Sequence, residues 1–319
     1  MKLFVGIVKK VIFLISFKFL KYMRVFDLHQ DLLYHILSNP NDIKILENYK
    51  NFGIEKFIFA IFPFRSFFSF YDVEEPLLFT LRGIEIAYDI SNKFNLKIIR
   101  SFEDLEDGNI IIGIEGLYFV RSVYELRIIH RLGVRSIGLV WNKDNLICSY
   151  FNSKNDFGLT DLGFEIVENA INLKMAIDLA HSSDKTFFDV INHFKRNIFV
   201  SHTGIRELNN IKRNLSEDMI YEFSKINGIV GIAFGDIFLS NLNLKQVSEY
   251  IAKLVEKFPN TIAIGSDFFG VPKEHQIENL NEPSHFINLY NHLKNYLSDE
   301  LIEKLFYKNA FEFFKRVLA

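Results

Sequence analysis

The sequence predicts a single (β/α)8 barrel of the TIM type, with eight parallel strands and a ring of helices. Apolar runs of strand length recur along the chain, and stretches with helical periodicity separate them. Such alternation is typical of a parallel sheet, and eight strand–helix units close a barrel. An open doubly wound sheet is less favoured, because no glycine-rich phosphate-binding pattern follows the first strand.

The predicted strands are short apolar runs. They cover residues 24–28, 55–61, 109–114, 135–140, 174–179, 197–201, 229–234 and 261–265. Between them, residues 118–132 and 243–257 show the spacing of apolar side chains that is typical of an amphipathic helix. A last helix over about 297–317 is expected to pack on the outside of the barrel.

Helix ends and one long loop carry signals of their own. Thr160 and Ser216 precede helical stretches and are residue types that cap helix N-termini. Gly228 follows the second of these stretches and predicts a left-handed C-terminal cap. The polar segment 142–158 follows the fourth strand, so we expect a lid or substrate loop over the barrel mouth, with Cys148 as a candidate substrate contact.

Composition limits the class of protein. The chain has 319 residues, of which 49% are apolar, enough for a sizeable core in one barrel domain. The net charge of -2 gives no reason to expect nucleic acid or an acidic lipid surface as a partner. The single cysteine cannot form an internal disulfide and favours a reducing compartment, so we expect a cytoplasmic protein.

Residues 1–22 form an apolar and basic extension that precedes the barrel domain, residues 23–319. Lysines interrupt its apolar run, which is therefore too short and too charged to span a bilayer. Three interpretations stay open. The extension is an amphipathic helix in contact with a membrane surface, a helix packed on the barrel base or on a partner, or an upstream extension of the gene with Met23 as the true start.

Acidic and imidazole side chains stand at the C-terminal ends of five of the predicted strands. They are His29 and Asp31 in RVFDLHQD, Glu115 in IIIGIEG, His181 in MAIDLAH, His202 in IFVSH and Asp267 in TIAIGSD. Because the C-terminal ends of parallel strands converge at one mouth of a barrel, these side chains should gather there. Three histidines and three carboxylates suit one or two divalent metal ions, and a metal at a barrel mouth suits hydrolysis.

These segments and their neighbours resemble the membrane (renal-type) dipeptidases, which are binuclear zinc enzymes of the amidohydrolase-like barrel group. The matching pieces run in the family's order from Phe26 to Phe268: FDLHQDL, GIEGL, LGVRSIGLVWNKDN, GLTDLG, AIDLAHSS, VSHTGIR, KRNLSEDM, NGIVGIAF and IGSDF. The resemblance implies a zinc-dependent dipeptidase with two Zn²⁺ ions, a dipeptide substrate and a homodimer.

The resemblance also implies the metal ligands. His29 and Asp31 would bind one ion, and His181 and His202 would bind the second. Glu115 would bridge the two ions through its two carboxylate oxygens. A hydroxide between the ions would attack the peptide carbonyl, because metal-bound water titrates near pH ~7.

Further residues match the family's catalytic and substrate contacts. Asp267, and Glu115 as the bridging carboxylate, are the catalytic candidates, with Asp267 passing a proton from water to the leaving amine. Arg213 in KRNLSEDM would hold the substrate carboxylate with its planar guanidinium. Trp141 stands where some members have a histidine that assists the tetrahedral intermediate. Its indole N–H is a candidate substrate contact, and Asn142 is a second one.

Some positions lie outside this set of contacts. Asn145 is an alternative to Asn142 as a compensating donor. Phe269 replaces an aspartate that is common in the family and makes the pocket more apolar. Arg135 and Arg206 are expected to form structural ion pairs, and the remaining histidines are expected to have surface or packing roles, with His35 near enough to Asp31 to support it.

Two other functions stay open. One is a metal-dependent amidohydrolase that acts on a cyclic amide, a lactone or an N-acyl amino acid. Arg213 argues against it, because a guanidinium favours a substrate with a free carboxylate. The other is a non-catalytic metal-binding barrel, associated with a membrane through residues 1–22. The presence of every candidate ligand together with Asp267 argues against it.

Overall fold

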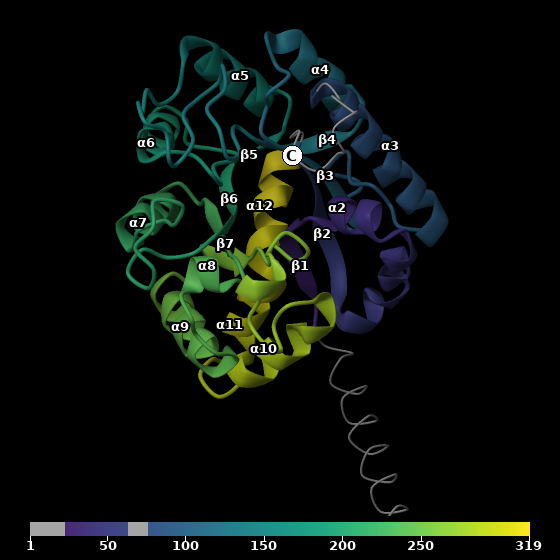
Figure 1. Cartoon of the computed structure of the whole chain (residues 1–319), viewed down its shortest axis with the longest axis vertical. Helices are drawn as coiled ribbons and strands as arrows, with labels where there is room; N and C mark the ends of the chain where they lie inside the picture. The colour runs from purple at the N-terminus through teal and green to yellow at the C-terminus, as the bar shows by residue number, and fades with distance from the viewer. Residues whose placement is uncertain (1–22, 63–75) are drawn as a thin grey trace, which may run out of the picture.

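Eight parallel strands curl into a barrel in the order in which they occur along the chain (Figure 1). The computed structural model describes residues 23–62 and 76–319. Backbone hydrogen bonds from Asp31 N to Phe268 O (3.0 Å) and from Asp267 N to His29 O (3.2 Å) join the end of the last strand to the first. The predicted barrel is therefore confirmed. The interpretations of residues 1–22 stay predictions, because that segment lies outside the described residues.

Each of the predicted strands is present, with ends close to those expected. They are β1 (Val25–Gln30), β2 (Ile54–Ile61), β3 (Ile110–Glu115), β4 (Val134–Gly138), β5 (Ala176–Asp178), β6 (Ile198–Thr203), β7 (Ile229–Ile232) and β8 (Ile262–Ile264). All of their residues except Glu55 are buried. Parallel strands covered on both faces have this property, which explains why they appear in the sequence as continuous apolar runs.

Helices alternate with the strands and surround the barrel (Figure 1). They are α2 (Leu32–Ser38), α3 (Pro76–Phe94), α4 (Val123–Arg131), α5 (Asp161–Asn172), α6 (Asp184–His193), α7 (Glu217–Lys225), α8 (Asp236–Leu239), α9 (Leu244–Lys257), α10 (Phe286–Leu293), α11 (Asp299–Glu303) and α12 (Asn309–Leu318). Short 3₁₀ turns η1 (Pro40–Asn48) and η2 (Lys50–Phe52) follow α2, and a π-helical turn, η6 (Lys304–Lys308), joins α11 to α12. None of the described helices combines the length and apolarity needed to cross a bilayer.

The predicted helix starts are confirmed, and the predicted left-handed cap is one residue off. Thr160 accepts a hydrogen bond from Gly163 N (3.0 Å), and Ser216 accepts one from Met219 N (3.2 Å). The left-handed residue after α7 is Asn227, with φ of 54°, and not Gly228. Asparagine tolerates this conformation. Glycine is needed next to it for a different reason, since a Cβ on Gly228 would lie 2.6 Å from the Phe223 ring.

The prediction that the C-terminal helix packs on the outside of the barrel is wrong. In Figure 1 α12 crosses the centre of the view, in front of the strands. Its side chains Phe313 and Phe314 join a buried cluster with residues near the starts of the strands, among them Phe26 and Phe199. The helix therefore covers the N-terminal end of the barrel, which leaves the opposite, C-terminal end for the site.

Candidate metal centre

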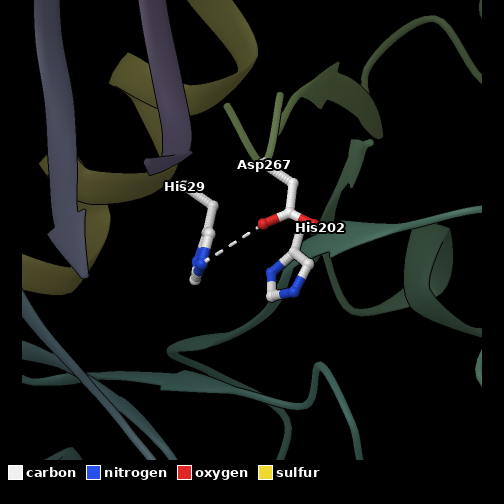
Figure 2. Close-up of side chains that lie close together, drawn as sticks. All are labelled: His29, His202 and Asp267. Atoms are coloured by element: carbon white, nitrogen blue, oxygen red, sulfur yellow. Dashed lines mark ion pairs between the residues drawn. The ribbon is translucent and has the colours of Figure 1, made fainter. Parts of the chain in front are cut away.

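The C-terminal ends of the strands open into a cavity of about 1160 Å³. Its lining includes the following residues singled out from the sequence: Asp31, Glu115, Trp141, Asn142, His181, His202, Arg213 and Asp267. His29 is buried close beneath them, and Figure 2 shows its ring beside His202 and Asp267. The structure therefore brings together every residue proposed from the sequence for metal binding and catalysis.

Glu115 lies at the centre of the candidate ligands, at the end of β3. Its Oε2 is 3.8 Å from His29 Nε2, while its Oε1 is 2.9 Å from His181 Nε2 and 3.5 Å from His202 Nε2. His29 Nε2 is also 3.5 Å from Asp31 Oδ1. One carboxylate oxygen thus faces the His29–Asp31 pair, and the other faces the His181–His202 pair. This is the arrangement that a bridging carboxylate requires.

The imidazoles of His181 and His202 point their Nε2 atoms at each other, 3.1 Å apart. Burial, together with the positive charges of Arg213 and His29, lowers the pKa of both well below the ordinary value, so both rings are neutral. The Nδ1 of His181 is 2.8 Å from Asn142 Oδ1, which can only accept. His181 therefore carries its proton on Nδ1 and presents a lone pair at Nε2, as a metal ligand must.

Three buried atoms of the centre have no hydrogen-bond partner in the described part of the chain: His29 Nε2, Asp31 Oδ1 and Glu115 Oε1. A buried polar atom without a partner is costly, and most native proteins avoid it. Each of these atoms is a good donor to a divalent cation. Groups of three such ligand atoms form around His29–Asp31–Glu115, Glu115–His181–His202 and His29–His202–Asp267, each within 4.8 Å. The residues therefore fit a metal cofactor.

Metal binding should displace protons from this centre. Burial lowers the pKa of His29, but the negative charges of Glu115, Asp31 and Asp267 outweigh burial and raise it to about 10 in the metal-free protein. A metal ion needs the unprotonated ring. Below about pH 9, each rise of one pH unit should therefore increase the apparent metal affinity about tenfold for each proton displaced. Calorimetry in buffers of different ionisation enthalpy would count the protons, and an affinity independent of pH would contradict this assignment.

Strained backbone marks the site. His181, Asp267 and Phe269 have φ of 64°, 58° and 73°, in the left-handed region that L residues rarely adopt. Each such residue costs of order 1–3 kcal/mol, and such residues cluster at functional sites. Asp267 is held in place because its carbonyl accepts hydrogen bonds from Gly270 N (3.1 Å) and Val271 N (3.3 Å). The turn therefore fixes the Asp267 carboxylate close to the His29 ring.

Gly270 is a residue of the site that sequence reasoning missed. A Cβ at this position would lie 2.1 Å from Asp31 Oδ2 and 2.6 Å from Asp267 Oδ1. Any side chain here would push at least one of the two carboxylates away. No local pattern shows this requirement, because Gly270 has an ordinary φ and Asp31, the nearer of the two carboxylates, is distant in the sequence.

Arg213 and Asp267 lie at the cavity wall with opposite charges. The guanidinium of Arg213 is buried, donates from Nη2 to His202 O (3.1 Å), and makes no ion pair with any described residue. Glu217, an acidic residue at the start of α7, pairs with Lys257 and not with Arg213. Burial and the nearby Asp31 raise the pKa of Asp267 to about 7, although His29 and Arg213 oppose the shift.

The segment after β4 folds back on itself, and only part of it reaches the cavity. Trp141, Asn142 and Phe151 line the cavity, and the Trp141 ring stacks on Phe62 with centroids 4.8 Å apart. Asn145 is used inside the loop, where its Oδ1 accepts from Ile147 N and Cys148 N. The prediction that Cys148 contacts substrate is wrong, because its side chain is fully buried and outside the cavity lining.

Among the other predicted positions, Arg206 forms its expected ion pair, 2.8 Å from Asp184. Arg135 does not form one with any described residue. It donates instead to the carbonyls of Arg100 (2.6 Å), His130 (2.8 Å) and Val134 (2.7 Å). His35 lines the cavity and stacks on Phe269, with ring centroids 4.6 Å apart.

Sequence comparisons identify one family. A model described as "Membrane dipeptidase (Peptidase family M19)" matches residues 17–319. An uncharacterised protein of Klebsiella pneumoniae is 28% identical over 208 residues, which cover 60% of this chain and 76% of that protein. An uncharacterised dipeptidase of Schizosaccharomyces pombe is 28% identical over 61% of this chain, and the dipeptidase verJ of Clonostachys rogersoniana is 28% identical over 62%. The chain spans 51% and 54% of these two longer proteins.

Solved structures share the fold. Dipeptidase AC, a metallopeptidase, superposes with a TM-score of 0.82 at 21% identity and covers 93% of this chain and 99% of its own. A metallopeptidase of Rhodobacter sphaeroides, bound to a phosphinate mimic of the dipeptide L-Ala-D-Ala, gives a TM-score of 0.81 at 20% identity over 92% and 99% of the two chains. An amidohydrolase of Pseudomonas aeruginosa gives 0.78 at 19% identity over 93% and 97%.

Proposed function

Because the chain belongs to the membrane dipeptidase family, peptidase family M19, we propose that it hydrolyses the peptide bond of dipeptides with the help of two zinc ions. The observation that carries the binuclear proposal is the orientation of Glu115, whose two oxygens face two separate pairs of ligands. His29 and Asp31 would hold one ion, and His181 and His202 the other. When bound, the ions would supply a hydroxide between them at neutral pH and polarise the carbonyl.

The substrate would be oriented by charge. Arg213 is a buried cation without a carboxylate partner among the described residues, and it lies at the wall of the cavity. Burying a cation in this way is costly unless an anion compensates it. The C-terminal carboxylate of a dipeptide would provide that anion through a two-pronged pair of hydrogen bonds. The dipeptide mimic bound to the Rhodobacter sphaeroides relative supports a substrate of this size.

Asp267 would transfer the proton of the attacking water to the leaving amine. Its carboxylate lies 3.9 Å from His29 Nε2 and therefore beside the metal ligands (Figure 2). Its raised pKa, about 7 in the metal-free site, is close to the value that suits a group which both accepts and donates a proton at neutral pH. Asp267 would accept a proton from the attacking water and donate it to the nitrogen of the leaving amine.

Exchanging Arg213 for methionine tests the substrate class. The charge-assisted bond to a carboxylate is worth roughly 1.5–3 kcal/mol. Arg213→Met should therefore lower kcat/KM for a free dipeptide by about 10- to 150-fold. It should hardly change kcat/KM for the matching dipeptide amide, which lacks the carboxylate and should be a poor substrate of the unmodified enzyme. The four measurements form a double-mutant cycle, with one change in the protein and one in the ligand.

The result distinguishes a dipeptidase from an amidohydrolase that acts on a cyclic amide or a lactone. Equal losses on the acid and the amide would mean that Arg213 acts on stability and not on the carboxylate, and would favour a cyclic amide or lactone as substrate. Arg206→Met serves as the matched control. Arg206 lies in the same loop as Arg213, between β6 and α7, and already has a carboxylate partner, Asp184. Its replacement should therefore change kcat/KM for the acid and for the amide by the same factor.

Other features stay predictions. Trp141 and Asn142 are placed to contact a substrate because both line the cavity. The homodimer, the cytoplasmic location, and a membrane contact through residues 1–22 rest on the sequence alone.

A further inference from the structure

A single hydroxyl group lies next to two histidines of the metal centre. One of them belongs to the His29–Asp31 half and the other to the His181–His202 half. The Oγ of Ser201 lies 2.8 Å from His202 Nδ1 and 3.4 Å from His29 Nδ1. The two rings lie against each other, with centroids 3.9 Å apart. Ser201 is buried, with 1% of its surface exposed. Among the described residues, this hydroxyl is the group that lies within hydrogen-bond distance of Nδ1 in both rings.

A buried carboxylate stands behind the hydroxyl. Asp178, at the end of β5, is 4% exposed; burial raises the pKa of its carboxyl, and the nearby Ser201 hydroxyl opposes that shift. Its Oδ1 also accepts from Ser201 N (2.8 Å) and from Ala180 N (2.9 Å). A carboxylate can only accept, so the Ser201 hydroxyl would supply the proton of any bond between the two side chains, and we take that proton to point toward Asp178. The two lone pairs of the hydroxyl are then left for the two imidazoles.

The position of Ser201 is fixed by close backbone packing. A Cβ on Gly231 in β7 would lie 1.9 Å from the Ser201 carbonyl oxygen, and one on Gly265, directly after β8, would lie 1.8 Å from it, so the backbone approaches Ser201 as closely as glycine allows. The backbone of β6 cannot shift to give the histidines another partner. The geometry of the hydroxyl is therefore set by the barrel.

From this arrangement we propose that Ser201 and Asp178 form one positioning unit for both halves of the metal centre. The unit holds a proton of His29 and of His202 on Nδ1, so that Nε2 is the nitrogen of each ring that binds a metal ion, in His29 once the metal has displaced its second proton. His181 depends instead on Asn142, which performs the same task from the loop after β4. The inference rests on the proposed metal centre and adds the residues that give two of its histidines the right tautomer.

Substitutions of Ser201 and of Asp178 should disturb the two histidines in different ways. Ser201→Ala removes the acceptor but leaves each ring free to choose its tautomer. Asp178→Asn places an NH₂ group where the carboxylate accepted the serine proton, so the hydroxyl must turn and donate to one imidazole. That ring then carries its proton on Nε2, where it blocks the metal. Asp178→Asn should therefore be the more damaging change, although it alters fewer atoms in contact with the histidines.

Metal titration of the full-length protein tests the inference, with zinc competed by a chromophoric chelator. Partners that orient ligands are worth about 10- to 100-fold in affinity. Ser201→Ala should weaken both equivalents of zinc by about that factor, and Asp178→Asn should weaken zinc binding at least as strongly. Ser182→Ala is the matched control. Ser182 follows His181, and its buried hydroxyl has no partner among the described residues, so its removal should leave both affinities unchanged.

An NMR measurement distinguishes a change in the histidine tautomers from a loss of folded structure. Long-range ¹⁵N–¹H spectra of histidine-labelled, zinc-loaded protein should show Nδ1–H forms for His29 and His202. Ser201→Ala should broaden or lose the two Nδ1–H signals while the signal of His181 persists. Wild-type zinc affinity in both variants, or unchanged Nδ1–H signals, would overturn the positioning role. Failure of the unmodified protein to bind zinc would instead overturn the proposed function.

Discussion

Replacing Glu115 with alanine is expected to remove both metal ions and to abolish hydrolysis. Glu115 is the only described residue that approaches the imidazoles of both halves with separate oxygens, 3.8 Å from His29 and 2.9 Å from His181. Its loss deprives each half of a ligand. Without bound metal the nucleophile is ordinary water, whose pKa is ~15.7 and not near ~7, so turnover should fall by more than about 10⁴-fold.

Elemental analysis after dialysis would measure the effect on metal content. The unmodified protein should retain roughly two equivalents, as a binuclear centre requires. His181→Ala touches only one half and should lose about one equivalent. His193 lies at the end of α6, away from the cavity lining, so the control His193→Ala should lose no metal. Two retained equivalents in Glu115→Ala would contradict a bridging role, and an unmodified protein without metal under metal-replete conditions would contradict the metal centre itself.

The convergence of these ligands was predictable because it depends on topology. Apolar runs identify parallel strands, and the C-terminal ends of parallel strands meet at one mouth. A residue at a strand end is therefore a residue at the site, whatever its separation along the chain. His29 and Asp267 illustrate this, since they are distant in sequence but lie 3.9 Å apart in the structure.

Other features depend on distances that no pattern in the sequence records. Gly270 matters because the carboxylate of Asp31, which is distant in the sequence, packs against it beside that of Asp267. Ser201 matters because its hydroxyl lies between two rings and a carboxylate on separate strands. The misplacement of α12 has a related cause. Periodicity shows that a helix has an apolar face but not which surface will cover it, and here that surface is the open base of the barrel.

Exchanging Asp267 for asparagine should reduce turnover by about 10²- to 10⁴-fold, which is the usual contribution of a positioned acid–base group. Asparagine keeps the shape of the side chain but cannot accept the proton of the attacking water. It is also a suitable replacement for this backbone, because Asp267 has a φ of 58° and asparagine tolerates the left-handed region. A loss of activity can therefore be assigned to the missing carboxylate and not to added strain.

Metal content distinguishes two roles for Asp267. Its carboxylate forms a group of potential ligands with His29 and His202, so a ligand role would make Asp267→Asn lose metal. The proton-transfer role predicts full metal content with low turnover.

The pH profile adds an independent test of proton transfer. The pKa of Asp267 is about 7 in the metal-free site, and bound cations favour its charged form and lower that value. The activity of the unmodified enzyme should therefore fall as the pH drops below about 7, because the carboxylate gains a proton and can no longer act as a base. Asp267→Asn should lose the part of this acidic limb that follows Asp267 and keep the part that follows the metal-bound water, which titrates near pH ~7. An unchanged limb together with unchanged turnover would leave Asp267 with only a structural part in the turn that follows β8.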